Sequence, residues 1–164
     1  VVNIDSLGAI SETSLTRNVQ IEMTTSGLPS TFVPGRNLIF FAFAGALAYR
    51  RGLRHLVAGM CETDYSGYPD CRNETLQTLA RAINLGTDEN FVIDTPLMHV
   101  DKAGTFAMAH DLGGDALLNL IIENTHSCYR GDRTHRHAWG YGCNDCPACD
   151  LRRKGYEKFA GARP

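Results

Sequence analysis

Three cysteines lie within seven residues near the end of the chain, in the segment GCNDCPACD (142–150). Cys143, Cys146 and Cys149 form two overlapping CxxC turns, and Cys128 precedes them with fourteen residues between. A CxxC turn brings two sulfurs onto one metal ion, and four thiolates in a tetrahedron are typical of structural Zn²⁺ with no open coordination position. We therefore predict one structural zinc ion bound by Cys128, Cys143, Cys146 and Cys149.

The sequence leaves other ligand chemistry open. An iron–sulfur cluster also takes four thiolates, although the usual ferredoxin-type spacing is not reproduced here. His135 or His137 could replace Cys128 as the fourth ligand, but the simpler interpretation is that both are solvated loop histidines. Four thiolates on zinc carry an excess negative charge. Three arginines are close enough in sequence to offset it: Arg130, Arg152 and Arg153.

Two polar loops concentrate a second kind of chemistry, VPGRN (33–37) and CETDYSGYPDCR (61–72). A small, planar, polar ring system would find aromatic faces, carboxylate acceptors and guanidinium donors in them. The alternative is that they are ordinary solvated loops. The candidate substrate-binding residues of these loops are Arg36, Asn37, Glu62, Asp64, Tyr68, Asp70 and Arg72.

The segments around these loops alternate between helix and strand patterns. Short apolar runs at 55–60 and 91–94 predict parallel strands, whereas residues 5–17 are polar and turn-rich. The run 38–52 predicts a helix that is buried on most faces and capped by Gly52. Further helices are predicted at 73–85, 101–112 with Asp101 as the N-cap, 115–124 and 151–159. Such alternation predicts an α/β layered fold with a parallel sheet, in which ligands bind beyond the carboxyl ends of the strands.

Bulk composition narrows the class of protein. The 164 residues suit a single domain, 1–164, with a zinc-binding segment at 125–150. The formal net charge of −2 makes no case for nucleic-acid or membrane partners. The longest apolar run, 38–49, is too short to cross a bilayer, and the first residues lack the pattern of a signal peptide. Six cysteines in such a chain favour reduced thiols, and we expect a cytoplasmic protein.

Four motifs together resemble one enzyme family. They are STFVPGRNLIF, AGMCETDYSGYPDCR, TPL followed by DKA, and CYRG followed by GCNDCPACDLRRKGYE. In this order they are similar to 7-cyano-7-deazaguanine synthase, the QueC or ExsB family, over about residues 15–159. The resemblance implies a Rossmann-like fold of the adenine nucleotide alpha hydrolase type, shared by PP-loop ATPases, with one bound zinc.

The resemblance also implies an activity. Family members are ligases of queuosine biosynthesis that form carbon–nitrogen bonds. They convert 7-carboxy-7-deazaguanine and ammonia to the 7-cyano compound preQ0, using ATP with Mg²⁺. The carboxylate is activated as an adenylate, an amide forms, and a second activation dehydrates it to the nitrile. The family's zinc ligands correspond to Cys128, Cys143, Cys146 and Cys149, and Lys102 at a helix start is a candidate phosphate-binding residue.

The chain departs from the family pattern in two places. The glycine-rich SGGxDS loop that grips the pyrophosphate of ATP is not present in these residues, so we expect an N-terminally incomplete fold and the C-terminal portion of a longer protein. Such a piece is not expected to hydrolyse ATP well by itself, and we expect it to associate as a homodimer. The run DKAGTF has Gly104 where the family commonly carries Glu, and the segment between Cys128 and Cys143 is longer than usual.

Two other functions compete with the ligase. The first is a non-catalytic zinc-binding module that recognises a nucleobase or a nucleic acid, which the knuckle and the basic run 152–154 permit. An isolated zinc ribbon would not need the loop 61–72, which argues against this alternative. The second is a related PP-loop enzyme with a different substrate, for which residues 66–71 would be expected to change first.

Overall fold

The structure is a computed structural model that describes residues 3–62 and 67–163. The chain divides into two compact units, unit 1 (Val1–His99) and unit 2 (Val100–Pro164). Each unit is described by itself, and the prediction of a single domain stays a prediction. Within the described ranges, no helix is both long enough and apolar enough to cross a membrane.

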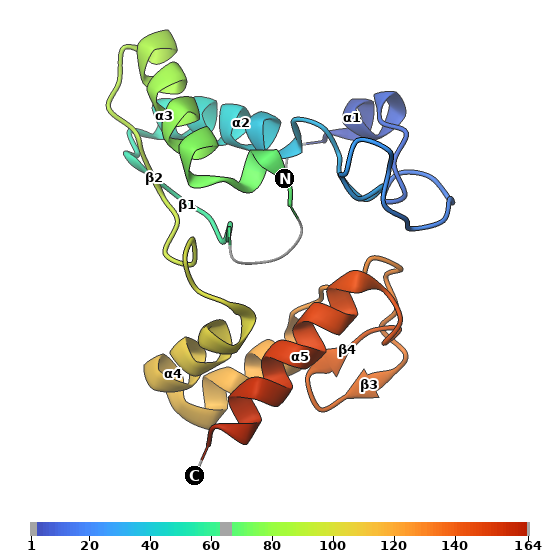
Figure 1. The fold of residues 1–164 in the computed structure, drawn as a ribbon. Helices are drawn as coiled ribbons and strands as arrows, with labels where there is room; N and C mark the ends of the chain where they lie inside the picture. The colour runs from blue at the N-terminus through green and yellow to red at the C-terminus, as the bar shows by residue number, and fades with distance from the viewer. Residues whose placement is uncertain (1–2, 63–66, 164) are drawn as a thin grey trace. The chain divides into compact units, whose positions relative to one another are not determined.

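Unit 1 is an α/β arrangement around a small parallel sheet (Figure 1). Strand β1 (His55–Val57) pairs in parallel with β2 (Val92–Asp94), with Leu56 opposite Ile93. The predicted parallel strands and the α/β class are thereby confirmed. The remaining elements of this unit are α1 (Asp5–Ile10), α2 (Arg36–Arg51), the 3₁₀ helix η1 (Pro69–Cys71) and α3 (Asn73–Thr87).

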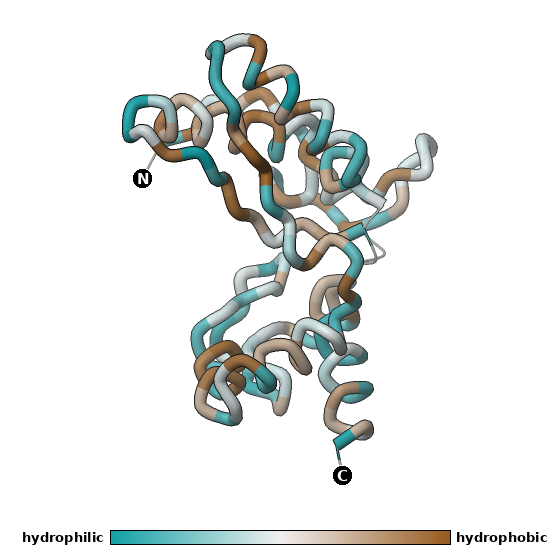
Figure 2. Tube along the Cα trace, turned by 90° about the vertical axis from the view of Figure 1, so that its left-hand side faces the viewer, coloured by the Kyte–Doolittle hydropathy of each residue, from teal (hydrophilic) through white to brown (hydrophobic). Residues whose placement is uncertain are grey.

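The core of unit 1 lies between the sheet and helices α2 and α3. Figure 2 shows brown, hydrophobic segments in this unit. The buried set is Phe41, Ala48, Leu56, Leu76, Phe91, Ile93 and Met98. Gly52 ends α2 in a left-handed conformation (φ 63°) and its N–H bonds to the carbonyls of Ala48 and Tyr49, as the sequence predicts.

Two expectations for unit 1 are wrong. Helix α2 is not buried on most faces: Phe43 is 46% exposed and Leu47 39%. The described helix α3 and the two-stranded sheet pack against only one side of α2, the side of Phe41 and Ala48, so the opposite apolar side meets no described element. The second difference is α1, a short helix within the segment 5–17, where the polar composition suggested only turns.

Unit 2 is built on two crossing helices. Helix α4 (Lys102–Asn124) contains non-helical Gly113 and Gly114, so it is two helical segments separated by a kink, as the sequence predicts. Helix α5 (Pro147–Gly161) packs across α4, and a short hairpin of β3 (Arg136–His137) and β4 (Gly140–Tyr141) lies in the connecting segment. The buried residues of this core are Ala103, Phe106, Leu118, Ile122 and Phe159.

Helix α5 begins four residues earlier than the predicted 151–159. Pro147 occupies its first turn, where the missing N–H costs nothing, and Cys146 is the N-cap residue. Gly155 sits where α5 crosses α4, because a Cβ atom there would lie 2.4 Å from the Cβ of Lys102. The longer helix places Cys149 on a rigid turn instead of in an irregular loop.

Candidate functional site

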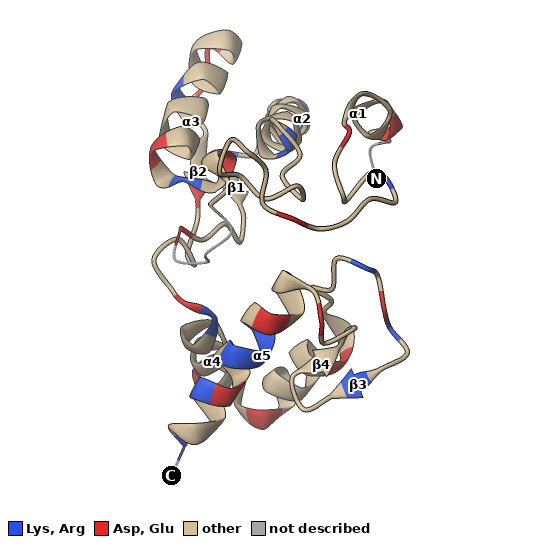
Figure 3. Cartoon of the chain, turned by 45° about the vertical axis from the view of Figure 1, so that its right-hand side comes forward, with Lys and Arg blue, Asp and Glu red and all other residues tan. Residues whose placement is uncertain are grey.

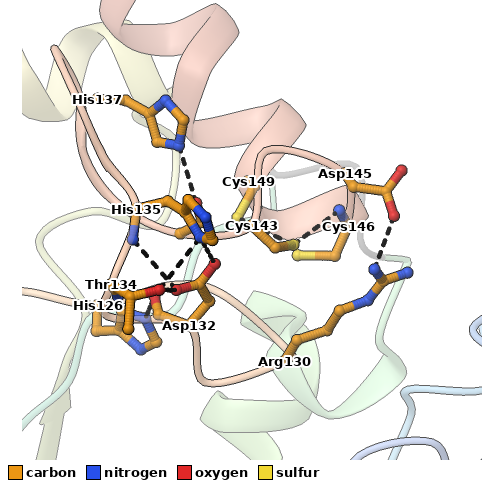
Figure 4. A network of polar contacts seen from close by, with 11 residues as sticks. His126, Arg130, Asp132, Thr134, His135, His137, Cys143, Asp145, Cys146 and Cys149 are labelled. Atoms are coloured by element: carbon orange, nitrogen blue, oxygen red, sulfur yellow. Dashed lines mark hydrogen bonds and ion pairs between the residues drawn. The ribbon is translucent and has the colours of Figure 1, made fainter.

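The four predicted cysteine ligands come together in unit 2. The Sγ atoms of Cys128, Cys143, Cys146 and Cys149 all lie within 4.8 Å of one another, and those of Cys143 and Cys149 are 4.0 Å apart. Tetrahedral coordination at Zn–S distances of 2.3 Å separates sulfurs by roughly 3.8 Å, so a small inward movement of the thiols completes such a site. Figure 4 shows the sulfurs of Cys143, Cys146 and Cys149 close together beside the start of α5.

Helix α5 and the preceding turn position three of the sulfurs. Cys146 caps the helix and Cys149 lies in its first turn, while the backbone N–H of Cys146 donates to the Cys143 sulfur at 3.4 Å. Asn144 adopts a left-handed conformation (φ 56°) that turns the chain between these residues. A Cβ at Gly142 would lie 2.6 Å from the Cys149 sulfur, so this position requires glycine.

The electrostatic surroundings of the thiols differ. Burial by itself raises the pKa of Cys128, but backbone N–H groups of Cys143, Asp132 and Arg130 donate to its sulfur and lower its pKa to about 6. The pKa of Cys149 is raised, first by burial and also by the neighbouring thiols of Cys146 and Cys128. Metal binding replaces the proton on each sulfur, so a divalent cation would stabilise the four neighbouring sulfurs as thiolates.

The histidines of the connecting segment have other partners. His135 contacts the Asp132 carboxylate at 2.6 Å, and this hydrogen bond is the first cause of the lowered pKa of Asp132. His137 lies 2.9 Å from the carbonyl of Gly142 and stacks on Trp139 at 4.6 Å between ring centroids. Within the described residues, the four cysteines form a candidate metal-binding group that includes neither histidine.

The three arginines near the cysteines are held in different ways. Arg130 forms an exposed ion pair with Asp145 at 2.8 Å, which Figure 4 shows beside the cysteines. Arg153 pairs with Asp150, and Figure 3 shows both acidic and basic residues on α5. Arg152 differs from both because it is only 5% exposed. Burial lowers the pKa of Arg152, and the neighbouring Cys149 acts in the opposite direction.

The two polar loops of unit 1 meet. The Asp70 carboxylate, 5% exposed, accepts from the backbone N–H of Asn37 at 3.1 Å, and the Asn37 side-chain amide donates to the Cys71 sulfur at 3.2 Å. The hydroxyls of Tyr68 and Thr31 share a hydrogen bond. Segments 33–37 and 67–72, separated in sequence, therefore form one polar cluster.

Two carboxylates in the described part of loop 61–72 meet the amino ends of helices. Asp70 accepts from the second residue of α2, and Glu62 accepts from the backbone N–H of Asn73, the first residue of α3. A carboxylate at a helix amino end satisfies a free amide and interacts favourably with the helix dipole. Both therefore have a structural role in addition to any contact with a ligand.

The other candidate residues lie at the starts of the same helices. Arg36 is the first residue of α2 and is half-buried, whereas Arg72 is the exposed N-cap residue of α3. Asp64 lies outside the described residues. Sequence reasoning missed Thr31, which is 1% exposed and bonds Tyr68; its place in the motif STFVPGRN was the only available signal.

Lys102 lies at the start of α4, as the sequence predicts, and is half-buried. The Asp101 side chain caps this helix by accepting from the N–H of Gly104 at 2.7 Å, and its other oxygen contacts Lys158 at 2.7 Å. One amide of the helix end is thus already bonded to a carboxylate, which limits the amides left for a phosphate.

Neither of two cavities of unit 1 is lined by the candidate residues. One of about 510 Å³ is lined by Ser30, Phe32 and Pro34 among others. The other, of about 580 Å³, is lined by residues of α3 and β2, including Arg81 and Asn84. Neither cavity assigns a substrate site to residues 36–37 or 67–72.

Comparison with known proteins identifies a family that matches this chain. The family described as "Queuosine biosynthesis protein QueC" matches residues 1–160. A 7-cyano-7-deazaguanine synthase of Parvibaculum lavamentivorans is 63% identical over 163 residues, covering 99% of this chain and 69% of the relative. Synthases with the same name from Azorhizobium caulinodans and a Polaromonas species are 61% and 60% identical, covering 98% and 99% of this chain. The chain spans 66% and 69% of those two relatives, about two thirds of their length.

Proposed function

The chain belongs to the QueC family of queuosine biosynthesis proteins, and from this membership we propose that it performs the reaction for which its relatives are named. That reaction is the formation of 7-cyano-7-deazaguanine, preQ0, by a ligase that forms carbon–nitrogen bonds. The observation that carries the proposal is about 60% identity along nearly the whole chain with synthases of this name. The implied fold is the Rossmann-like nucleotide-binding fold of PP-loop ATPases.

The proposed chemistry joins ammonia to 7-carboxy-7-deazaguanine. ATP with Mg²⁺ activates the carboxylate as an adenylate, ammonia displaces AMP to give the amide, and a second activation dehydrates the amide to the nitrile. Arg36 and Arg72 begin the two helices of the polar cluster, so their guanidinium groups are suited to hold a carboxylate or a phosphate. Tyr68 and Asn37 offer an aromatic edge and a side-chain amide beside them.

Asp70 and Glu62 can bind the base while they also hold the helix ends. Each carboxylate has two oxygens, and one oxygen of each accepts from a helix amide. The free lone pairs can still accept from the amino group of a deazaguanine. We propose that both residues bind the base and also hold the helix ends, with Asp64 as a further acceptor in unit 1. Lys102 of unit 2 is proposed separately as a phosphate-binding residue.

The same proposal includes a structural zinc ion. The four thiols, their mutual distances and the amide donated to Cys143 fit a tetrahedral tetrathiolate site better than an open catalytic one. Bound there, Zn²⁺ would join the segment carrying Cys128 to the start of α5. It would fix the C-terminal unit and supply no reactive group of its own.

The ligase assay follows substrate and products together. The protein is incubated with 7-carboxy-7-deazaguanine, ATP, Mg²⁺ and ammonium, and mass spectrometry should detect the amide and then the nitrile, with release of AMP. Calorimetry with 7-carboxy-7-deazaguanine alone tests binding without ATP. Arg72→Ala should weaken binding about tenfold or more, because a charge-assisted contact contributes roughly 1.5–3 kcal/mol.

The matched control for that variant is Arg81→Ala, an exposed arginine further along the same helix α3. It should bind 7-carboxy-7-deazaguanine as the unchanged protein does. A protein that neither binds this compound nor forms the amide from it would contradict the proposal.

Metal content is measured separately from activity. Elemental analysis should find about one zinc per chain, and Cys143→Ser or Cys149→Ser should remove it. Iron with visible absorbance would instead assign the cysteines to an iron–sulfur cluster. Arg163→Gln, at an exposed ion pair with Asp115, serves as the control that should retain the metal.

The comparisons do not favour the non-catalytic module or a PP-loop enzyme with another substrate, because the matched relatives share one synthase name. We further propose a cytoplasmic homodimer. The exposed apolar side of α2, including Phe40, Phe43 and Leu47, is a surface that association would bury. Sedimentation analysis that gives a monomer at micromolar concentration would reject the dimer.

A further inference from the structure

Arg152 is a buried arginine whose donors reach only neutral acceptors. Its side chain is almost wholly enclosed, at 5% exposure. The Nε atom donates to the Trp139 carbonyl at 2.8 Å, Nη1 to the Ser127 hydroxyl at 3.1 Å, and Nη2 to the Thr125 hydroxyl at 2.9 Å. A second bond from Nη2 reaches the Ile121 carbonyl at 3.2 Å. The guanidinium therefore ties the end of α4, the segment next to Cys128 and the hairpin to α5.

The charge of this guanidinium has no carboxylate partner in the described part of the chain, residues 3–62 and 67–163. Arg130, which is exposed, and Arg153, which is half-buried, are both paired with aspartates. Isolated buried charges are costly, so a buried cation is normally paired with an anion. The buried guanidinium of Arg152 therefore needs another source of negative charge to balance it.

The cysteine cluster is one source of negative charge close to Arg152 on α5. Cys149 precedes Arg152 by three residues on α5, so the two side chains lie on the same face of the helix one turn apart. Gly140, with φ of 119°, lets the guanidinium pack against the hairpin, because a Cβ there would lie 3.1 Å from Nη2 of Arg152. Four thiolates around a divalent cation carry a net charge of about −2, which a neighbouring guanidinium partly neutralises.

We propose that Arg152 supplies the buried counter-charge of the metal-loaded cysteine site and is a positioning residue for it, held in place by its hydrogen bonds to the surrounding chain. The inference rests on the zinc site of the proposed function. It distinguishes Arg152 from Arg130 and Arg153, whose charges are already neutralised by aspartates at the surface.

The test compares three variants of α5 with the unchanged protein. Arg152→Gln removes the charge but keeps an amide that can donate, Arg152→Lys keeps the charge, and Arg153→Gln is the matched control. Zn²⁺ affinity is measured by competition with a chelator of known affinity. The thermal midpoint of each variant is measured with Zn²⁺ and after complete removal of the metal.

We expect Arg152→Gln to lower Zn²⁺ affinity at least about tenfold, Arg152→Lys by no more than about threefold, and Arg153→Gln by less than about twofold. The increase in thermal midpoint on adding Zn²⁺ should shrink in Arg152→Gln and persist in Arg152→Lys. A hydrogen-bonding brace without a charge role would instead lower the midpoints of both forms equally, and that result overturns the proposal.

Four further outcomes also decide the proposal. If Arg152→Gln does not fold even with Zn²⁺ while Arg152→Lys folds and binds it, the need for a charge is supported; if Arg152→Lys also fails, the proposal is rejected. If the unchanged protein binds no Zn²⁺, both the proposed metal site and the proposed role of Arg152 are rejected. If the unchanged protein and Arg152→Gln bind Zn²⁺ with equal affinity, the proposed role of Arg152 is rejected and the metal site is retained.

Discussion

The crossing of α4 and α5 at Gly155 gives the sharpest prediction about the stability of unit 2. In Gly155→Ala the new Cβ would lie 2.4 Å from the Cβ of Lys102 and 3.0 Å from its carbonyl carbon. Carbon atoms pack best at about 3.5–4.0 Å, so α5 must move away from α4 by roughly an ångström. Part of this obstacle is backbone, so a change of rotamer at Lys102 cannot relieve it.

The expected cost is the balance of two effects. Alanine is favoured over glycine inside a helix by about 1 kcal/mol, which stabilises α5. Overpacking a tight contact costs about 1–3 kcal/mol, and the short backbone distance places this site at the upper end. The net destabilisation is therefore about 2 kcal/mol, which lowers the midpoint of a unit of this size by about 10 °C.

Trp139 provides the assay, because it is the only tryptophan of the chain and is buried in unit 2. Its fluorescence is followed during thermal and urea unfolding. Gly161→Ala is the matched control on the same helix, since a Cβ there meets nothing within 4 Å, and it should leave the midpoint unchanged or slightly raised. A Gly155→Ala protein at least as stable as the control would refute the close crossing.

Two further predictions concern helix ends. Asp70→Ala should destabilise unit 1 by about 1 kcal/mol, because α2 loses a hydrogen-bond acceptor at its amino end. Asp70→Asn keeps an acceptor oxygen and should recover most of this stability. Amide hydrogen exchange in the first turn of α2 measures the effect of each variant. The hydrogen bond from Lys158 lowers the pKa of Asp101 in the folded protein. The stability that this contact contributes is therefore present above about pH 4, and it is lost as the pH falls through the lowered pKa of Asp101. The Trp139 midpoint should therefore drop on acidification below about pH 4, and Asp101→Asn should reduce that drop; an identical acid profile in the variant would exclude the contact.

Local spacing made the cluster of four cysteines predictable. Two CxxC turns place three sulfurs together through short-range geometry, whatever the rest of the fold does, and Cys128 was the remaining thiol near enough to complete the set. The strands β1 and β2 were predictable for a similar reason, because short apolar runs between helices indicate buried parallel strands. The family followed from motifs whose residues can be identified without knowing where they lie.

Long-range contacts decided what those residues do. The composition of the polar loops suggested ligand contacts for Asp70 and Glu62, but only the folded chain brings each carboxylate to the amino end of a helix. Sequence proximity made three arginines equivalent near the cysteines, and burial separates Arg152 from the other two. The sequence by itself determined the family and the residue types of the candidate sites. Tertiary packing determined which charged side chains are paired and which are buried, because hydrogen-bond partners and burial depend on segments that are distant in sequence.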